Sequence, residues 1–540
     1  MNSHAPAVDL GIDCRDPQQC MALIASLPLT KTGQVHRTLT ALLQGLALAP
    51  PPAASYLQVL EMARTPLAFA QEETASRYAL RSLVPGRPDD KTLDAVVRLW
   101  RLMAQAYAQV ASLGGENPAI QNRLALICHR CIHYAGKPAL EYYRARRELP
   151  KGLWSDLYGY FSTAEEWGIA DTPVAEPLND QSQSQSCAQA LAAVILVDLG
   201  NPFGRSPREF PWLARWSQRF SVFTEVQPAD ETCDNRRYAV DLIQDRGPRP
   251  LELVGVNPNV RRLITTRLAD EMHRVIAQLK AKVAPADLGL GENVFEPAAS
   301  RLLTNLYRPW CLASSPRRFQ RRQATGTAKV CYGFDAIHYF VNGAEFIQPA
   351  HVRMYSRSEF ETIVTFRYQV DPGERLHVKT AQVEYLTETW QVADQSVNGF
   401  RIRRENPGES VEHGQLLGVR ASDSDVFLLG QVSWLMYEAN GGLTAGVHVL
   451  PGVPLGVAIR PSGPMVSHSE RYVRAFLLPE LPALKEPTSL VLPKGWFEPE
   501  RVLDVYSERS TELRLQEILT QGPDFERVSF ISLRHKPVSV

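Results

Sequence analysis

Two short segments hold most of the residues whose types and spacing could do chemistry. Residues 316–322 read Pro-Arg-Arg-Phe-Gln-Arg-Arg, and the arginines are Arg317, Arg318, Arg321 and Arg322. Residues 394–399 read Asp-Gln-Ser-Val-Asn-Gly. Arginine forks bind phosphate and the O6/N7 edge of guanine in a bidentate way. A carboxylate can accept from the N–H groups on the other edge of guanine, and a hydroxyl can add one bond. The two segments together predict an anionic ligand that carries guanine.

The order of these residues resembles the two-part signature of the PilZ domain. Arg318-x-x-x-Arg322 fits the first part, Arg317-x-x-x-Arg321 fits it equally well, and Asp394-x-Ser396-x-x-Gly399 fits the second. The resemblance implies a small antiparallel β-barrel at residues 312–455 that binds the bacterial second messenger cyclic di-GMP, as one molecule or as an intercalated pair.

The resemblance also implies a role for each motif residue. The arginines would bind phosphate and the guanine edge, while Asp394 and Ser396 would fix the base against the barrel wall. Gly399 would let the backbone approach the ligand closely, because glycine lacks a Cβ atom. The two motifs lie further apart than in a minimal domain of this family, which predicts an insertion near 341–388.

Short alternating runs follow the second motif, and they are the elements that must position it. Alternation of apolar and polar residues is typical of half-buried strands, and turn residues separate the runs. The runs at 400–403, 415–419, 431–435 and 443–449 predict the strands of the barrel. Further runs at 489–492, 502–505 and 528–531 predict a small C-terminal β module at 456–540.

The N-terminal half has the longer period of helices. Residues 91–111 place apolar side chains at three- and four-residue steps after a Pro-Asp-Asp start signal. This pattern predicts a helical bundle or short α-solenoid at 1–175 and a mixed, mainly helical domain at 187–295. Within the second domain we expect a buried helix at 188–199, strands at 238–242 and 251–254, and a helix at 260–283. The fold class is therefore multidomain, helical first and β-rich afterwards.

The run Cys128-His129-Arg130-Cys131-Ile132-His133 could suggest a metal or haem site. The spacing of the second cysteine and the histidine does not fit haem attachment, and no second cysteine pair follows at zinc spacing. The run also lies in a helical stretch, where Cys128 and Cys131 would share one face. We therefore predict buried thiols and no metal site.

The composition of the whole chain narrows the class of function. The 58 basic and 58 acidic residues give a net charge of zero, which argues against a binder of nucleic-acid polymers or membrane surfaces. The first twenty residues do not resemble a secretion signal, and the apolar run 188–197 is too short to insert into a membrane. We therefore expect a cytoplasmic protein.

Two functional hypotheses follow from the sequence. No phosphate-binding glycine loop, zinc-protease motif or nucleophile elbow is present, so we predict no enzyme activity and no cofactor. The first hypothesis is a cyclic di-GMP receptor whose arginine segment closes over the ligand and relays the signal to a protein partner. The alternative is a helical adaptor whose barrel binds protein and no nucleotide.

Overall fold

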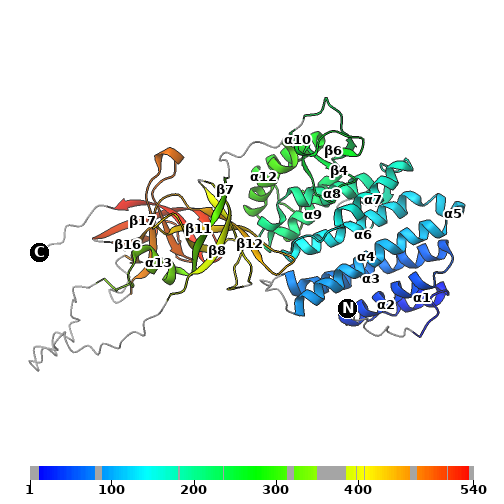
Figure 1. The fold of residues 1–540 in the computed structure, drawn as a ribbon, viewed down its shortest axis with the longest axis horizontal. Coiled ribbons are helices and arrows are strands. Elements are labelled where there is room, and N and C mark those ends of the chain that lie inside the picture. Colours follow the sequence, from blue (N-terminus) through cyan, green and yellow to red (C-terminus); the bar gives the residue numbers. More distant parts are fainter. Residues whose placement is uncertain are drawn as a thin grey trace, which may run out of the picture. The chain divides into compact units, whose positions relative to one another are not determined.

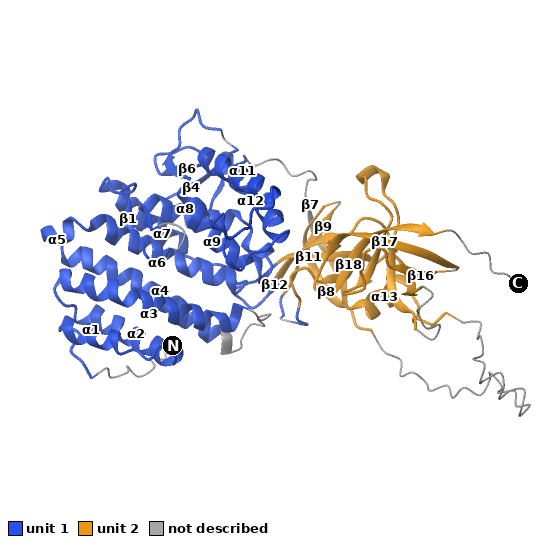
Figure 2. Cartoon of the chain, turned by 180° about the vertical axis from the view of Figure 1, so that it is seen from behind, with its two compact units in different colours: residues 1–318, 405–410, 435–443 blue, residues 319–404, 411–434, 444–540 orange. Residues whose placement is uncertain are grey.

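The structure is a computed structural model, and it describes residues 11–79, 88–179, 183–234, 236–312, 322–349, 385–396, 398–406, 408–462, 471–507 and 509–533. The chain forms two compact units, which Figure 2 shows in different colours. The first unit comprises residues 1–318, 405–410 and 435–443, and the second comprises residues 319–404, 411–434 and 444–540.

The first unit is mainly helical, as the sequence predicts. Its helices are α1 (Pro17–Ala25), α2 (Thr32–Leu48), α3 (Ala53–Ala79), α4 (Pro88–Leu113), α5 (Pro118–Gln121), α6 (Leu124–Arg144), α7 (Leu153–Glu166), α8 (Cys187–Leu199), α9 (Glu209–Ser221), α10 (Leu251–Val254), α11 (Thr266–Lys280) and α12 (Ala298–Cys311). Helices α3, α4, α6 and α7 pack side by side in chain order (Figure 1). None of the helices in the described ranges is both long and apolar enough to cross a bilayer.

Helix α8 lies at the centre of this unit because it is apolar on all sides. It packs against α6, α7 and α9, and its residues from Cys187 to Val197 are buried apart from Gln189. A small sheet with the order β3-β6-β4-β5 adjoins it. The strands are β3 (Glu225–Pro228), β4 (Tyr238–Asp241), β5 (Arg249–Pro250) and β6 (Val260–Ile264); a separate short pair is formed by β1 (Val174–Ala175) and β2 (Ser184–Gln185).

Two element predictions in this region are wrong. Residues 251–254 form helix α10 instead of a strand. Residues 260–264 form strand β6 instead of the first turn of a long helix, and the helix α11 begins only at Thr266. Strand β6 pairs with both β3 and β4, so its hydrogen bonds come from partners that are distant in sequence. Such pairing overrides the local helical period.

The Cys128–His133 run lies in α6, as predicted. Cys128 and Cys131 are 6% and 3% exposed, so both are buried thiols. The side chains of His129 and Arg130 are buried too, and Arg130 donates to the Glu176 carboxylate at 2.7 Å. Among the described residues, no group of three or more histidine, cysteine or acidic side chains is placed to hold a metal ion.

The second part of the chain contains two closed β-barrels, so the fold class predicted from the sequence is confirmed. The first barrel has the cyclic strand order β7-β8-β9-β12-β11-β10. Its strands are β7 (Arg322–Tyr332), β8 (Glu388–Ser396), β9 (Gly399–Arg404), β10 (Leu416–Ala421), β11 (Leu428–Tyr437) and β12 (Leu443–Val449). Helix α13 (Phe334–Asn342) follows β7 and begins the long connection to β8. Residues 350–384 of this predicted insertion lie outside the described ranges.

The predicted C-terminal β module is a second closed barrel. Its cyclic strand order is β13-β14-β15-β18-β17-β16. The strands are β13 (Leu455–Pro461), β14 (Val473–Leu478), β15 (Ser489–Pro493), β16 (Val502–Tyr506), β17 (Ser510–Gln521) and β18 (Phe525–Leu533). Inward-facing aliphatic residues from all six strands, such as Val457, Leu490 and Val528, fill its interior.

Candidate functional site

The two predicted motifs meet on neighbouring strands of the first barrel. The described chain resumes at Arg322, the first residue of β7, whereas Arg317, Arg318 and Arg321 lie outside the described residues. Strand β7 pairs antiparallel with β8, so that Arg322 lies opposite Gln395 and Gln323 lies opposite Asp394. The end of the arginine segment therefore lies beside the second motif.

A β-bulge in β8 decides which way the second motif faces. Val392 is opposite Ile402, both are buried, and both face the barrel interior. In a regular strand Asp394 would face the same way, because side chains two residues apart share a face. One extra residue lies in β8 between Val392 and Asp394, and Asp394 therefore lies opposite Arg401, which is exposed. The bulge turns the motif to the outer face.

On the outer face, the motif side chains contact their partners on β9. Asp394 Oδ2 lies 4.0 Å from Arg401 Nη1, and the two side chains are 18% and 47% exposed. Ser396 lies opposite Gly399 in the last pair of the β8–β9 ladder, and its hydroxyl donates to the Gly399 carbonyl at 3.4 Å. Asp394 and Ser396 are thus partly exposed and lie on the same side of the barrel.

The outer face beside Asp394 is basic, and the sequence analysis missed these residues. Arg403 lies opposite Gln391 on the same side as Arg401. Further along the face, Arg420 lies opposite Lys329. We call the surface formed by Asp394, Ser396, Arg401, Arg403 and Lys329 the motif face. The alternation of Arg401 and Arg403 with apolar neighbours after Gly399 is the sequence signal that could have identified them.

Gly399 has a structural role that the sequence did not predict. A Cβ atom at this position would lie 2.2 Å from the Val447 carbonyl oxygen, so β9 and β12 approach each other too closely for any side chain. The φ of Gly399 is outside the positive range that only glycine adopts readily. The requirement for glycine here comes from strand packing, whatever the ligand.

A partly buried cluster holds the opposite end of β8 in place. The Glu388 carboxylate accepts hydrogen bonds from Tyr332 at 2.8 Å and from Trp390 at 3.2 Å. Arg404 also donates to Glu388, and its guanidinium lies 4.7 Å from the centre of the Trp390 ring. Burial and the neighbouring Glu388 carboxylate raise the pKa of Tyr332, so this hydroxyl stays protonated. The cluster ties β7, β8 and β9 together behind the motif face.

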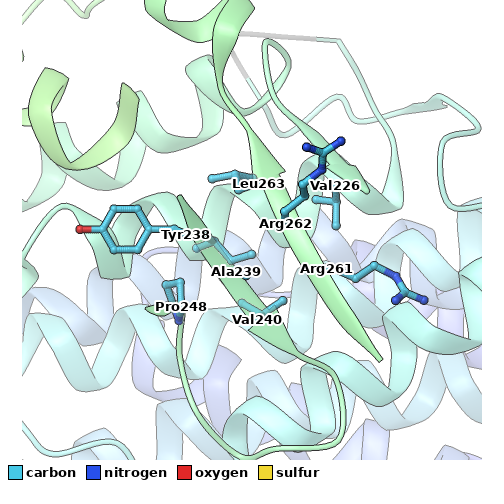
Figure 3. A pocket seen from close by; sticks show the side chains of 9 residues that line it. Val226, Tyr238, Ala239, Val240, Pro248, Arg261, Arg262 and Leu263 are labelled. Carbon is cyan, nitrogen blue, oxygen red and sulfur yellow. The ribbon is translucent and has the colours of Figure 1, made fainter. Parts of the chain in front are cut away.

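One depression of the helical unit lies over its small sheet (Figure 3). It is lined by Ile195, Val226, Tyr238, Ala239, Val240, Pro248, Arg261, Arg262 and Leu263. Its volume is at most about 200 Å³. Small-molecule sites usually occupy roughly 300–1,000 Å³. Arg261 is also paired with Glu165 at 2.8 Å. This depression is therefore a weaker candidate than the motif face.

Comparison with known proteins gives three family matches in chain order. Residues 18–230 match the N-terminal domain of the cyclic-di-GMP receptor FimW, residues 238–364 match its middle PilZ domain, and residues 457–533 match its C-terminal β-barrel domain. The PilZ match begins at β4 and ends before Asp394, so it includes the arginine segment and leaves out the second motif. The predicted boundaries of the PilZ-like barrel, 312–455, remain a prediction.

One curated relative resembles the chain over most of its length. The cyclic-di-GMP receptor FimW of Pseudomonas aeruginosa is 23% identical over 528 residues, which cover 89% of this chain and 84% of the relative. The matches indicate a receptor family and no catalytic one. Together with the barrel and the helical region, they place the chain in the PilZ-containing receptor family that the FimW domains define.

Proposed function

We propose that this protein is a receptor that binds cyclic di-GMP on the motif face of its first barrel. The observation that carries the proposal is the bulge in β8, which presents Asp394 and Ser396 outward beside Arg401. The arginine segment ends on the adjacent strand. A dinucleotide with two phosphates and two guanines is complementary to this combination of fixed acceptors and basic side chains.

Each motif residue has a defined task in this proposal. Arg317, Arg318, Arg321 and Arg322 bind phosphate and guanine edges, with the alternative registers of the arginine motif both retained. Asp394 accepts from the N–H groups of guanine, and Ser396 adds a hydroxyl contact. Gly399 keeps β9 against β12, which holds the edge of the motif face in position. Arg401 and Arg403 add positive charge beside the ligand.

The output of the receptor is a change in the arginine segment. We infer that the segment folds over the bound ligand and thereby alters how the helical unit presents itself to a protein partner. The ligand can shift the equilibrium between the open and the folded segment only by the difference in its binding free energy for the two states. The FimW relative carries the name of a cyclic-di-GMP receptor, which supports this reading over an enzymatic one. A cytoplasmic location stays a prediction.

Isothermal titration of the full chain with cyclic di-GMP tests the proposal. Saturable heat with one or two ligand molecules per chain is expected. Flat injections over the micromolar range would instead favour the adaptor hypothesis, in which the barrel binds only protein. GTP in place of cyclic di-GMP serves as the control, because a single guanine with a triphosphate offers the same groups without the second base.

A further inference from the structure

The two barrels have the same strand topology. In the first, the cyclic order is β7-β8-β9-β12-β11-β10, and in the second it is β13-β14-β15-β18-β17-β16. The six strands of each barrel are therefore arranged in the same order, and each strand of the second barrel has the number of its counterpart in the first plus six. Strands β13, β14 and β15 are thus the counterparts of β7, β8 and β9, which carry the motif face. The family match describes the second barrel as a β-barrel domain only.

The ladder ends identify the counterparts of the motif residues. The β8–β9 ladder ends with the pair Ser396–Gly399, and the β14–β15 ladder ends with the pair Leu478–Ser489. Leu478 therefore takes the place of Ser396. Phe476, two residues earlier, takes the place of Asp394. The six residues before β13 read Val-Leu-Pro-Gly-Val-Pro and contain no arginine.

The side chains at these places are buried between the barrels. Phe476 and Leu478 are fully buried and belong to one apolar cluster with Cys331, Ile337 and Leu429 of the first barrel and its helix α13. The inward-facing residues of β14 pack instead into the interior of the second barrel. The outer face of β14 and β15 is thus covered by protein at the positions where the motif face of the first barrel is open.

Polar contacts fix the same interface. The Asn342 side chain at the end of α13 accepts from the Gly456 N–H at 3.1 Å and donates to the Gly456 carbonyl at 3.3 Å. A Cβ atom at Gly456 would lie 2.5 Å from this amide group. The Asp524 carboxylate of the second barrel accepts from the Leu416 N–H at 3.0 Å. These bonds require one specific arrangement of the two barrels.

We propose that the second barrel is a second copy of the PilZ barrel topology whose counterpart of the motif face has become the docking surface for α13 and the first barrel. Each chain then offers a single nucleotide-binding face. The docking follows from the contacts of the described residues, whereas the single binding face rests on the proposed function. The partner of the second barrel is therefore the first barrel of the same chain.

The docking is tested by the reactivity of Cys331, which is fully buried in the interface. We expect Phe476→Asp to raise the rate of Cys331 alkylation in the full chain by at least about tenfold, measured by mass spectrometry of the modified peptide. Ile531→Asp is the matched control, because Ile531 is 46% exposed on the same barrel. Cys128, buried in the helical unit, is the internal reference.

Two outcomes separate the docking from general unfolding. Leu478→Ala removes apolar volume without adding charge, and it should also expose Cys331 while Cys128 stays protected. If Cys331 stays as protected in both variants as in the parent, the docking surface is wrong. If Cys128 becomes as reactive as Cys331 in both variants, the effect is global unfolding, which also contradicts a local docking surface.

The single binding face is tested by titration with cyclic di-GMP. The double variant Arg322→Ala/Asp394→Ala should lose all saturable binding, whereas Arg474→Ala on the outer face of β14 should bind like the parent. Saturable binding that survives the double variant and is lost with Arg474→Ala would place a second site on the second barrel and overturn the proposal. If the parent itself does not bind, the proposed function fails, and the Cys331 measurement still decides the docking.

Discussion

Asp394 lies directly opposite Arg401 on the outer face of the first barrel, with 4.0 Å between Oδ2 and Nη1. Opposite charges across a pair of strands contribute only about 0.2–1 kcal/mol. The pair is therefore strong enough to orient the carboxylate and weak enough to be exchanged for the N–H groups of a guanine. Because Arg401 stays beside the ligand, it can then contact a phosphate.

Arg322 should contribute through the shape of its side chain as well as its charge. Removing a charged partner from a partly desolvated site costs ~2–5 kcal/mol. Arg322→Ala should therefore weaken cyclic di-GMP binding by on the order of thirtyfold or more. Arg322→Lys keeps the charge and loses the planar fork, so it should recover only part of the loss. Titration calorimetry measures both, with Arg274→Ala as the control, because the Arg274 side chain is 52% exposed on α11.

The outward orientation of Asp394 should be required for binding, whereas the extra residue itself should not. Deletion of Ala393 makes Asp394 follow Val392 directly and leaves it opposite Arg401 on the outer face, because neighbouring side chains of a strand alternate. This variant should therefore still bind cyclic di-GMP in titration calorimetry. The exchange Asp394→Gln/Gln395→Asp moves the carboxylate to the other face of β8 and should weaken binding by on the order of thirtyfold. Undiminished binding by a folded exchange variant would mean that the outward orientation of Asp394 is irrelevant.

Gly399 should matter for stability even without ligand. Forcing an extra methyl group into a packed site typically costs ~1–3 kcal/mol, and the Cβ of alanine would lie 2.2 Å from the Val447 carbonyl oxygen. Gly399→Ala should therefore lower the free energy of unfolding in denaturant titrations of the ligand-free protein. Gly159→Ala, which meets nothing within 4 Å in the middle of α7, should raise it by about 0.5–1 kcal/mol.

The sequence predicted the first barrel and a further β module because the signals of their strands are local. Alternation with period two identifies strands such as β9 and β12, and the spacing of Asp394, Ser396 and Gly399 survives the insertion before it. The bulge could not be predicted, because nothing in the sequence around Ala393 distinguishes an extra residue from a regular strand. The strand β6 was mistaken for helix because its hydrogen-bond partners are distant in the chain.

The helical unit should respond to pH through Asp198. Burial raises the pKa of this carboxyl from 3.8 to about 6, although Tyr143 donates a hydrogen bond to it. The folded state then binds more protons than the unfolded state between these values, so this group stabilises the fold as the pH falls from 7 toward 4. His129 acts in the opposite direction, because burial lowers its pKa from 6.5 to about 4.

The substitution Asp198→Asn separates these two contributions. It removes the group that gains stability in acid and leaves His129, so the variant should lose more stability than the parent between pH 7 and pH 5. Tyr143→Phe removes the hydrogen bond that favours the carboxylate, so the pKa of Asp198 should rise further. This variant should therefore lose less stability than the parent between pH 7 and pH 5. Denaturant unfolding followed by the far-ultraviolet helix signal measures the difference. Equal pH dependence in all three proteins would contradict this assignment.

The measurement that tests the central claim most directly is the affinity of Asp394→Ala for cyclic di-GMP. If Asp394 accepts from guanine, its loss leaves N–H donors without an acceptor in a water-poor site, and binding should weaken by on the order of thirtyfold. GTP should then compete poorly with cyclic di-GMP in the parent. If the motif face were only a basic patch, removing a negative charge would strengthen binding. Tighter binding by Asp394→Ala, with GTP competing as well as cyclic di-GMP, would contradict the guanine-binding site.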